Sequence, residues 1–157
     1  MKASDKLAEL RKKVTQKLLD DGRFDFIIPE VSNQIQKRTR LGKGVTESGD
    51  LKPLEKLSEN YVEQRKKGPL DSRTRPKKSN LTRTGQMLDA IQGVRNGSMF
   101  TFTFKNSRND GEKNSDIARW AAEKGRRFFD LSKSERIGLS RKISQVIKKK
   151  IKELFSS

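Results

Sequence analysis

The sequence predicts an α+β fold in which a small antiparallel sheet packs against amphipathic helices near the two ends of the chain. An Asn96-Gly97 turn followed by a strand of alternating residues predicts the sheet. Apolar residues that recur every three or four positions over residues 4–20, and again after residue 132, predict the helices. Only 31% of the residues are hydrophobic and 36% are charged, so the core of this one expected domain, residues 1–157, is small.

The N-terminal part, residues 1–35, is expected to be helical. Leu10, Val14 and Leu18 lie on one stripe of the first helix, and Gly22 suits its end. Pro29 suits the first turn of a second helix, because that position needs no backbone N–H donor.

The middle of the chain carries the largest share of the net positive charge, with 14 basic and 6 acidic residues between positions 36 and 83. Hydrophobic periodicity is lost over residues 36–53 and 69–80, so both segments are predicted to be flexible basic loops that gain order only on assembly. A short helical stripe, residues 54–62, separates them. Candidate contacts with DNA or with a partner ring lie in the two loops: Lys37, Arg38, Arg40, Lys43, Arg73, Arg75, Lys77 and Lys78.

Residues 84–157 are predicted to form the hairpin and the C-terminal helices. Thr84 is expected to cap a short helix that Gly93 ends, and the hairpin follows. Its second strand places three residues on the core face, namely Phe100, Phe102 and Phe104. A further helix is expected to turn Ile117, Trp120 and Ala121 inward.

The last predicted helix begins at a capping box made by Ser132 and Glu135. Ile143, Ile147 and Ile151 share its apolar stripe, and we expect them to pack against the side of the hairpin that bears Phe102. Lysines cover the rest of the helix, so this region is also expected to meet a negatively charged partner.

Composition excludes several kinds of chemistry. The chain has no His and no Cys, which removes imidazole catalysis, thiol nucleophiles, disulfides and the usual zinc sites. The carboxylates lie at helix ends and in loops, without an apolar setting that would tune a pKa, and no phosphate-binding motif is present. We therefore expect no enzyme activity, no cofactor and no metal. A metal-dependent nuclease would require Mg²⁺-dependent cleavage.

The net charge of +17 predicts a polyanionic neighbour, either nucleic acid or an acidic protein surface. No segment is apolar enough for a membrane helix and the N-terminus lacks a signal core, so a soluble protein without membrane contact is expected. Two classes stay open: a free, sequence-nonspecific basic nucleic-acid-binding protein, and a subunit of a larger assembly whose small core is completed by neighbours.

Four motifs follow one another in an order that resembles a family of tailed-bacteriophage morphogenesis proteins, which covers tail-completion, neck and minor tail proteins. They are residues 49–54 (GDLKPL), residues 61–65 (YVEQR), residues 81–88 (LTRTGQML) and residues 125–132 (GRRFFDLS). Leu51 stands where the family usually has an aromatic residue, and Gly125-Arg126 replaces a turn that usually contains Pro.

This resemblance implies an α+β fold, no enzyme activity and a place in the virion, assembled in the cytoplasm of the bacterial host. It implies a homo-oligomeric ring, expected to be a hexamer, at the head–tail joint. The neighbours of such a ring are other neck proteins and the tail-terminator or tail-tube proteins. Sequence-blind contact with packaged DNA would suit the basic loops.

Overall fold

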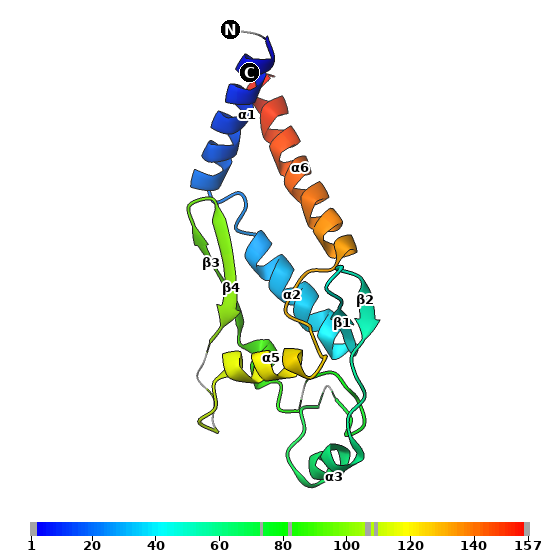
Figure 1. Cartoon of the computed structure of the whole chain (residues 1–157). Helices are drawn as coiled ribbons and strands as arrows, with labels where there is room; N and C mark the ends of the chain where they lie inside the picture. Colours follow the sequence, from blue (N-terminus) through cyan, green and yellow to red (C-terminus); the bar gives the residue numbers. More distant parts are fainter. Residues whose placement is uncertain (1–2, 73, 82, 106–107, 109, 156–157) are drawn as a thin grey trace.

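The predicted α+β fold is confirmed. The computed structural model describes residues 3–72, 74–81, 83–105, 108 and 110–155. Within these residues the chain forms six helices and two antiparallel sheets of two strands each, β1-β2 and β3-β4 (Figure 1).

The N-terminal helices form as the sequence predicts. Helix α1 spans Ala3–Asp20 and helix α2 spans Ile27–Arg40, with Pro29 in its first turn. Between them Gly22 adopts a φ of +68°, the left-handed conformation that lets glycine end a helix. Val31 and Ile35 are buried on the inner side of α2, as expected.

The expectation of a loop over residues 36–53 is wrong. Helix α2 continues through Arg40, and strands β1 (Lys43–Val45) and β2 (Leu51–Pro53) then pair as a small hairpin. Arg38 and Thr39 continue the buried stripe of α2, one turn beyond Ile35. The hydrophobic pattern breaks off there because polar residues occupy buried positions.

Two short helices follow. Helix α3 spans Glu59–Lys67, and its N-cap Ser58 accepts a hydrogen bond from the backbone N–H of Tyr61. Helix α4 spans Gln86–Asp89 and begins after Gly85, at a φ of +75°, instead of being capped by Thr84. Within the described part of residues 69–80 no helix or strand forms, as predicted.

The main hairpin joins strand β3 (Ile91–Asn96) to strand β4 (Met99–Phe104) across the predicted Asn96-Gly97 turn. Phe100, Phe102 and Phe104 share the inner face, and Phe104 is buried. Gly93 lies inside β3, opposite Phe102, and does not end the preceding helix. A Cβ at this position would come within 2.9 Å of the Phe102 ring, which explains a glycine in a strand.

Helix α5 spans Asn114–Glu123 and corrects one expected core residue. Asn114, Ala118 and Ala121 form its buried stripe, and Ile117 lies partly buried beside it. Trp120, expected inward, is 56% exposed. It lies on the neighbouring face of the helix, one position before Ala121.

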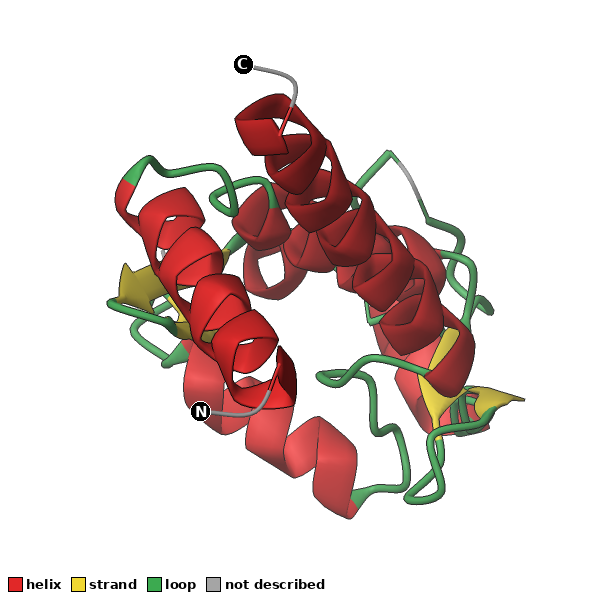
Figure 2. Ribbon diagram, turned by 90° about the horizontal axis from the view of Figure 1, so that it is seen from above, coloured by secondary structure: helices red, strands yellow, loops and turns green. Residues whose placement is uncertain are grey.

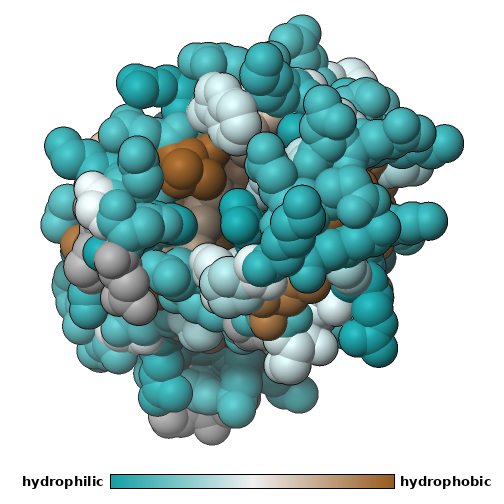
Figure 3. All heavy atoms as spheres, turned by 90° about the horizontal axis from the view of Figure 1, so that it is seen from below, coloured by the Kyte–Doolittle hydropathy of each residue, from teal (hydrophilic) through white to brown (hydrophobic). Residues whose placement is uncertain are grey.

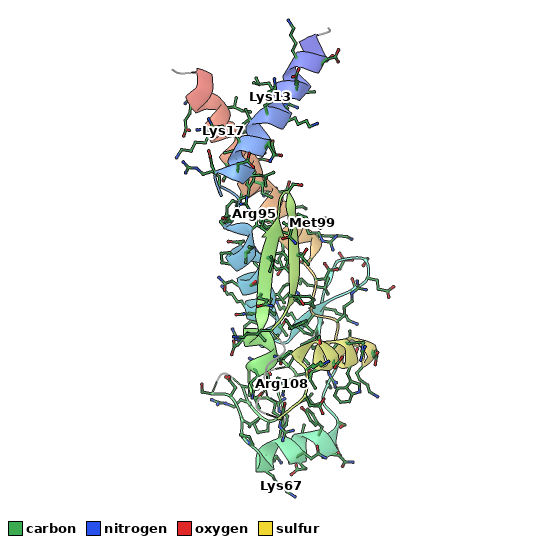
Figure 4. The ribbon with its side chains drawn as sticks, turned by 90° about the vertical axis from the view of Figure 1, so that its left-hand side faces the viewer. Lys13, Lys17, Lys67, Arg95, Met99 and Arg108 are labelled. Carbon is green, nitrogen blue, oxygen red and sulfur yellow. The ribbon has the colours of Figure 1, made fainter. Side chains whose placement is uncertain are left out.

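Helix α6 spans Lys133–Phe155, and its predicted capping box is present. The Ser132 N–H donates to Glu135 Oε2 at 2.7 Å, and the Glu135 N–H donates to Ser132 Oγ at 3.3 Å. Ile143, Ile147 and Ile151 lie partly buried against the common core. Helix α6 contacts α1, and both helices lie over the rest of the chain when it is seen from above (Figure 2). The two helices cross in the view of Figure 4, and the ion pairs Arg38–Glu135 and Lys142–Glu30 join α6 to α2 as well.

Candidate functional site

The basic residues expected to touch DNA lie on different segments of the chain. Lys37, Lys43, Arg75 and Lys77 are exposed, and Lys78 is half-buried. Lys37 belongs to α2 and Lys43 to β1, whereas the last three belong to the loop before α4. Arg73 lies outside the described residues.

Arg38 is a structural residue and not a surface contact. Its side chain is only 5% exposed and forms an ion pair with Glu135. The same guanidinium donates to the backbone oxygens of Phe128, at 2.5 Å, and Asp130, at 2.7 Å. Burial lowers the pKa of Arg38, and the carboxylate of Glu135 opposes that effect. Arg38 thus joins α2 to the start of α6.

Arg40, two positions further along α2, forms an ion pair with Asp89 of α4. Its side chain is 21% exposed. Arg38 and Arg40 therefore bind elements of the same chain. Arg38 is too buried for the surface contact expected of it, whereas a contact of the partly exposed Arg40 with DNA or a partner ring stays a prediction.

A hollow lies elsewhere on the described part of the molecule, between α3 and the layer formed by α4 and α5. It is a groove of about 1120 Å³. Seen from below, hydrophobic side chains lie in a hollow among hydrophilic ones (Figure 3). The groove brings together residues from the segment before α3, from α3 itself, from positions 81 and 83–87, and from α5.

The floor and walls of this groove are apolar and aromatic. Leu57, Leu81, Met87 and Ile117 provide the aliphatic part, and Tyr61 and Trp120 provide the rings. Leu81 has a φ of +53°, a left-handed conformation rare for a residue with a branched side chain.

The rim of the groove is basic. Six cationic side chains line it, and Asp110 is the one carboxylate among its described lining residues. The cations are Lys56, Arg65, Arg83, Arg108, Lys124 and Arg126. Arg108 lies beneath α5, on the side that faces α3 (Figure 4). It donates to both carboxylate oxygens of Asp110, at 2.8 and 2.5 Å, and this lowers the pKa of Asp110 to about 2.

Arg65 is a buried cation whose hydrogen-bond partners among the described residues are uncharged. It is 2% exposed, and its guanidinium donates to the Lys78 carbonyl at 2.9 Å and to Thr74 Oγ1 at 3.1 Å. Among the described residues no carboxylate pairs with it, and its Nε has no hydrogen-bond partner. Burial lowers the pKa of Arg65; Tyr61 opposes this and the nearby Arg83 adds to it.

The loop before α4 wraps around this arginine. Thr74 Oγ1 also donates to Asn80 Oδ1 at 2.8 Å, and Asn80 Nδ2 donates to the Arg40 carbonyl at 3.3 Å. Thr74 and Asn80 are both buried, so this basic loop has an ordered polar interior.

Sequence reasoning missed the groove as a site. One signal was present, because residues 81–88 stood out as a motif and residues 81 and 83–87 line the groove. The opposite wall comes from α3 and α5, and their approach cannot be read from local patterns.

Comparisons with known proteins add no assignment: no family model, no curated protein and no solved structure matches this chain. Within the described part of the chain, no helix is long and apolar enough to span a membrane. The same residues contain no group of three or more carboxylates placed to hold a metal ion.

Proposed function

We propose that this protein is a non-catalytic structural subunit of the head–tail joint of a tailed bacteriophage, where copies assemble into a ring. One observation carries the proposal beyond the motif order: large apolar side chains are exposed on separate parts of the molecule. They are Leu41, Leu51, Val94, Met99, Trp120 and Ile137, each between 46% and 65% exposed. Neighbouring subunits would cover such side chains.

The positions of these side chains suit contacts between unlike surfaces. Val94 and Met99 lie on the outer face of the β3-β4 hairpin, whereas Trp120 lies on α5. Figure 4 shows Met99 near the tip of the hairpin, well away from Arg108 and the groove beneath α5. A ring needs two different patches on each subunit, because its contacts run head to tail.

A joint through which DNA passes also needs surface cations that contact the phosphates, and this chain has exposed cations. Arg75 and Lys77 are exposed on the loop before α4, and Lys37 and Lys43 are exposed near the end of α2. Contacts of this kind are made to phosphates, ignore base sequence and weaken steeply with salt.

Two experiments test the proposal. Mass spectrometry and antibody labelling of purified particles should locate the protein at the neck, and finding it outside the virion would reject the assignment. Reversing the charge at Arg75, Lys77 and Lys78, together with Arg73, should reduce the yield of joined particles while heads and tails still form. Lys↔Arg exchanges at the same positions keep the charge and should preserve the yield.

The alternative is a free, sequence-nonspecific nucleic-acid-binding protein, which the net charge of +17 also favours. Tight, salt-dependent DNA binding by the isolated monomer, combined with absence from particles, would favour that alternative.

A further inference from the structure

We propose that the groove between α3 and α5 binds an acidic peptide segment of a neighbouring protein, whose apolar side chains sit on the groove floor. This inference deepens the proposed function by stating the chemistry of one partner. It rests on that function only for the partner's place in the virion, because the groove itself belongs to the single subunit.

Charge complementarity is the first argument. Six cations and one carboxylate line the groove, and Arg108 already binds that carboxylate. Lys56 and Lys124 are exposed at the rim, where side chains of an incoming segment would meet them first. Like charges held this close repel each other, so carboxylates entering the groove would relieve the repulsion.

The second argument is the buried charge of Arg65. A guanidinium removed from water is usually paired with a carboxylate, and none of the described residues supplies one here. Its two recorded acceptors, a carbonyl and a hydroxyl, carry no net charge. The field of Arg65, reinforced by Arg83, therefore extends to the groove and favours an anion there.

The third argument concerns the floor. Leu57 and Ile117, which are half-buried, and Met87, which is buried, give the groove an aliphatic lining beside the half-buried ring of Tyr61 and the exposed ring of Trp120. Leu81 adds its side chain to this surface from a left-handed backbone conformation. Unfavourable backbone conformations of this kind gather at ligand-binding positions, where the surrounding structure maintains them.

These features favour a peptide over a nucleic acid. A single-stranded nucleic acid would use flat rings for base stacking and a continuous basic track for its phosphates. Here the floor between the cations is mainly aliphatic, and such a surface matches Leu, Ile or Phe side chains. The volume of about 1120 Å³ accommodates several such side chains, as in grooves that bind one face of an amphipathic helix.

The chain contains a natural probe for this groove. Trp120 is its single tryptophan, lines the groove and is 56% exposed. The purified full chain is titrated with a Trp-free synthetic peptide of about 12 residues, made of Glu and Asp with Leu and Phe at helical spacing. Binding should shift Trp120 emission to shorter wavelength as the ring loses contact with water.

Two charge-matched double variants locate the binding. Lys56→Glu with Lys124→Glu reverses the charge at two exposed rim positions whose side chains make no hydrogen bond or ion pair with another described residue, and should weaken the binding of the peptide about tenfold or more. Lys148→Glu with Lys149→Glu makes the same charge change on the exposed side of α6 and should leave the affinity within about twofold. Anisotropy of a labelled peptide provides a second readout that does not depend on Trp120.

Three results would overturn the inference. One is equal binding of a peptide whose Leu and Phe are replaced by Ser. Another is that oligothymidine with the same charge as the peptide binds more tightly than the peptide and loses this binding in the Lys56→Glu, Lys124→Glu variant. That result would identify the groove as a nucleic-acid site. The third is an equal loss of affinity in both double variants. All three leave the neck assignment standing, since particle analysis tests that separately.

Discussion

At the scale of single residues, two arginines two positions apart on α2 have different roles. Arg38 is 5% exposed and bonds Glu135 and two carbonyl oxygens, whereas the Arg40–Asp89 pair is 21% and 45% exposed. Arg38→Ala should lower the free energy of unfolding by about 3 kcal/mol or more, because it leaves buried acceptors unpaired. Arg40→Ala should cost about 1 kcal/mol or less.

Urea denaturation of both variants measures the difference. Equal losses would show that the Arg38 network does not stabilise the junction between α2 and α6.

Asp110 offers a residue-scale prediction about pH. Its hydrogen bonds to Arg108 lower its pKa from 3.8 to about 2. The folded state therefore gains stability from this pair above pH 3.8, and loses that gain as the pH falls from 3.8 to about 2. NMR titration of the Asp110 carboxyl should give the low value, and Arg108→Gln should return it close to 3.8. A wild-type value already near 3.8 would contradict the pairing.

At the scale of elements, the apolar stripe of α6 determines how that helix packs. Ile147 lies partly buried against the core, and Ile137 on the same helix is 53% exposed. Ile147→Asp should cost about 2 kcal/mol or more, because a carboxylate would enter an apolar contact. Ile137→Asp carries a comparable helix-propensity cost and should change stability by about 0.5 kcal/mol at most. Thermal unfolding followed by circular dichroism compares them, and an unchanged melting temperature for Ile147→Asp would place α6 away from the core.

At the scale of the whole molecule, backbone hydrogen bonds join the β1-β2 hairpin to distant parts of the chain. The Val45 N–H donates to the Arg127 carbonyl at 2.9 Å, and the Lys133 N–H donates to the Gly49 carbonyl at 2.8 Å. The Leu54 N–H closes the hairpin itself by donating to the Gly42 carbonyl at 2.8 Å. We expect the Val45 and Leu54 amides to exchange slowly in the isolated subunit, and those of Arg75 and Lys77 to exchange fast. Hydrogen exchange read by NMR tests this order. If the Val45 amide exchanged as fast as the Lys77 amide, residues 36–53 would be a mobile loop, as the sequence first predicted.

Local sequence patterns were sufficient wherever neighbours along the chain supply the stabilising contacts. The stripe of α1, the Asn96-Gly97 turn, the alternation of Phe100 to Phe104 and the capping box of α6 all formed as predicted. Each is an interaction over a few residues, or a periodicity of a single element, so the sequence alone determined it.

Only the tertiary structure decided the roles of Arg38, Trp120 and the groove. Arg38 is buried because Glu135, 97 positions later, and the carbonyls near it satisfy its guanidinium. Trp120 is exposed because Ala118 and Ala121 occupy the inward side of α5, and α3 stands across the groove from it. Whether a polar side chain is buried, or an aromatic one exposed, depends on partners brought together by folding, and the local pattern does not contain them.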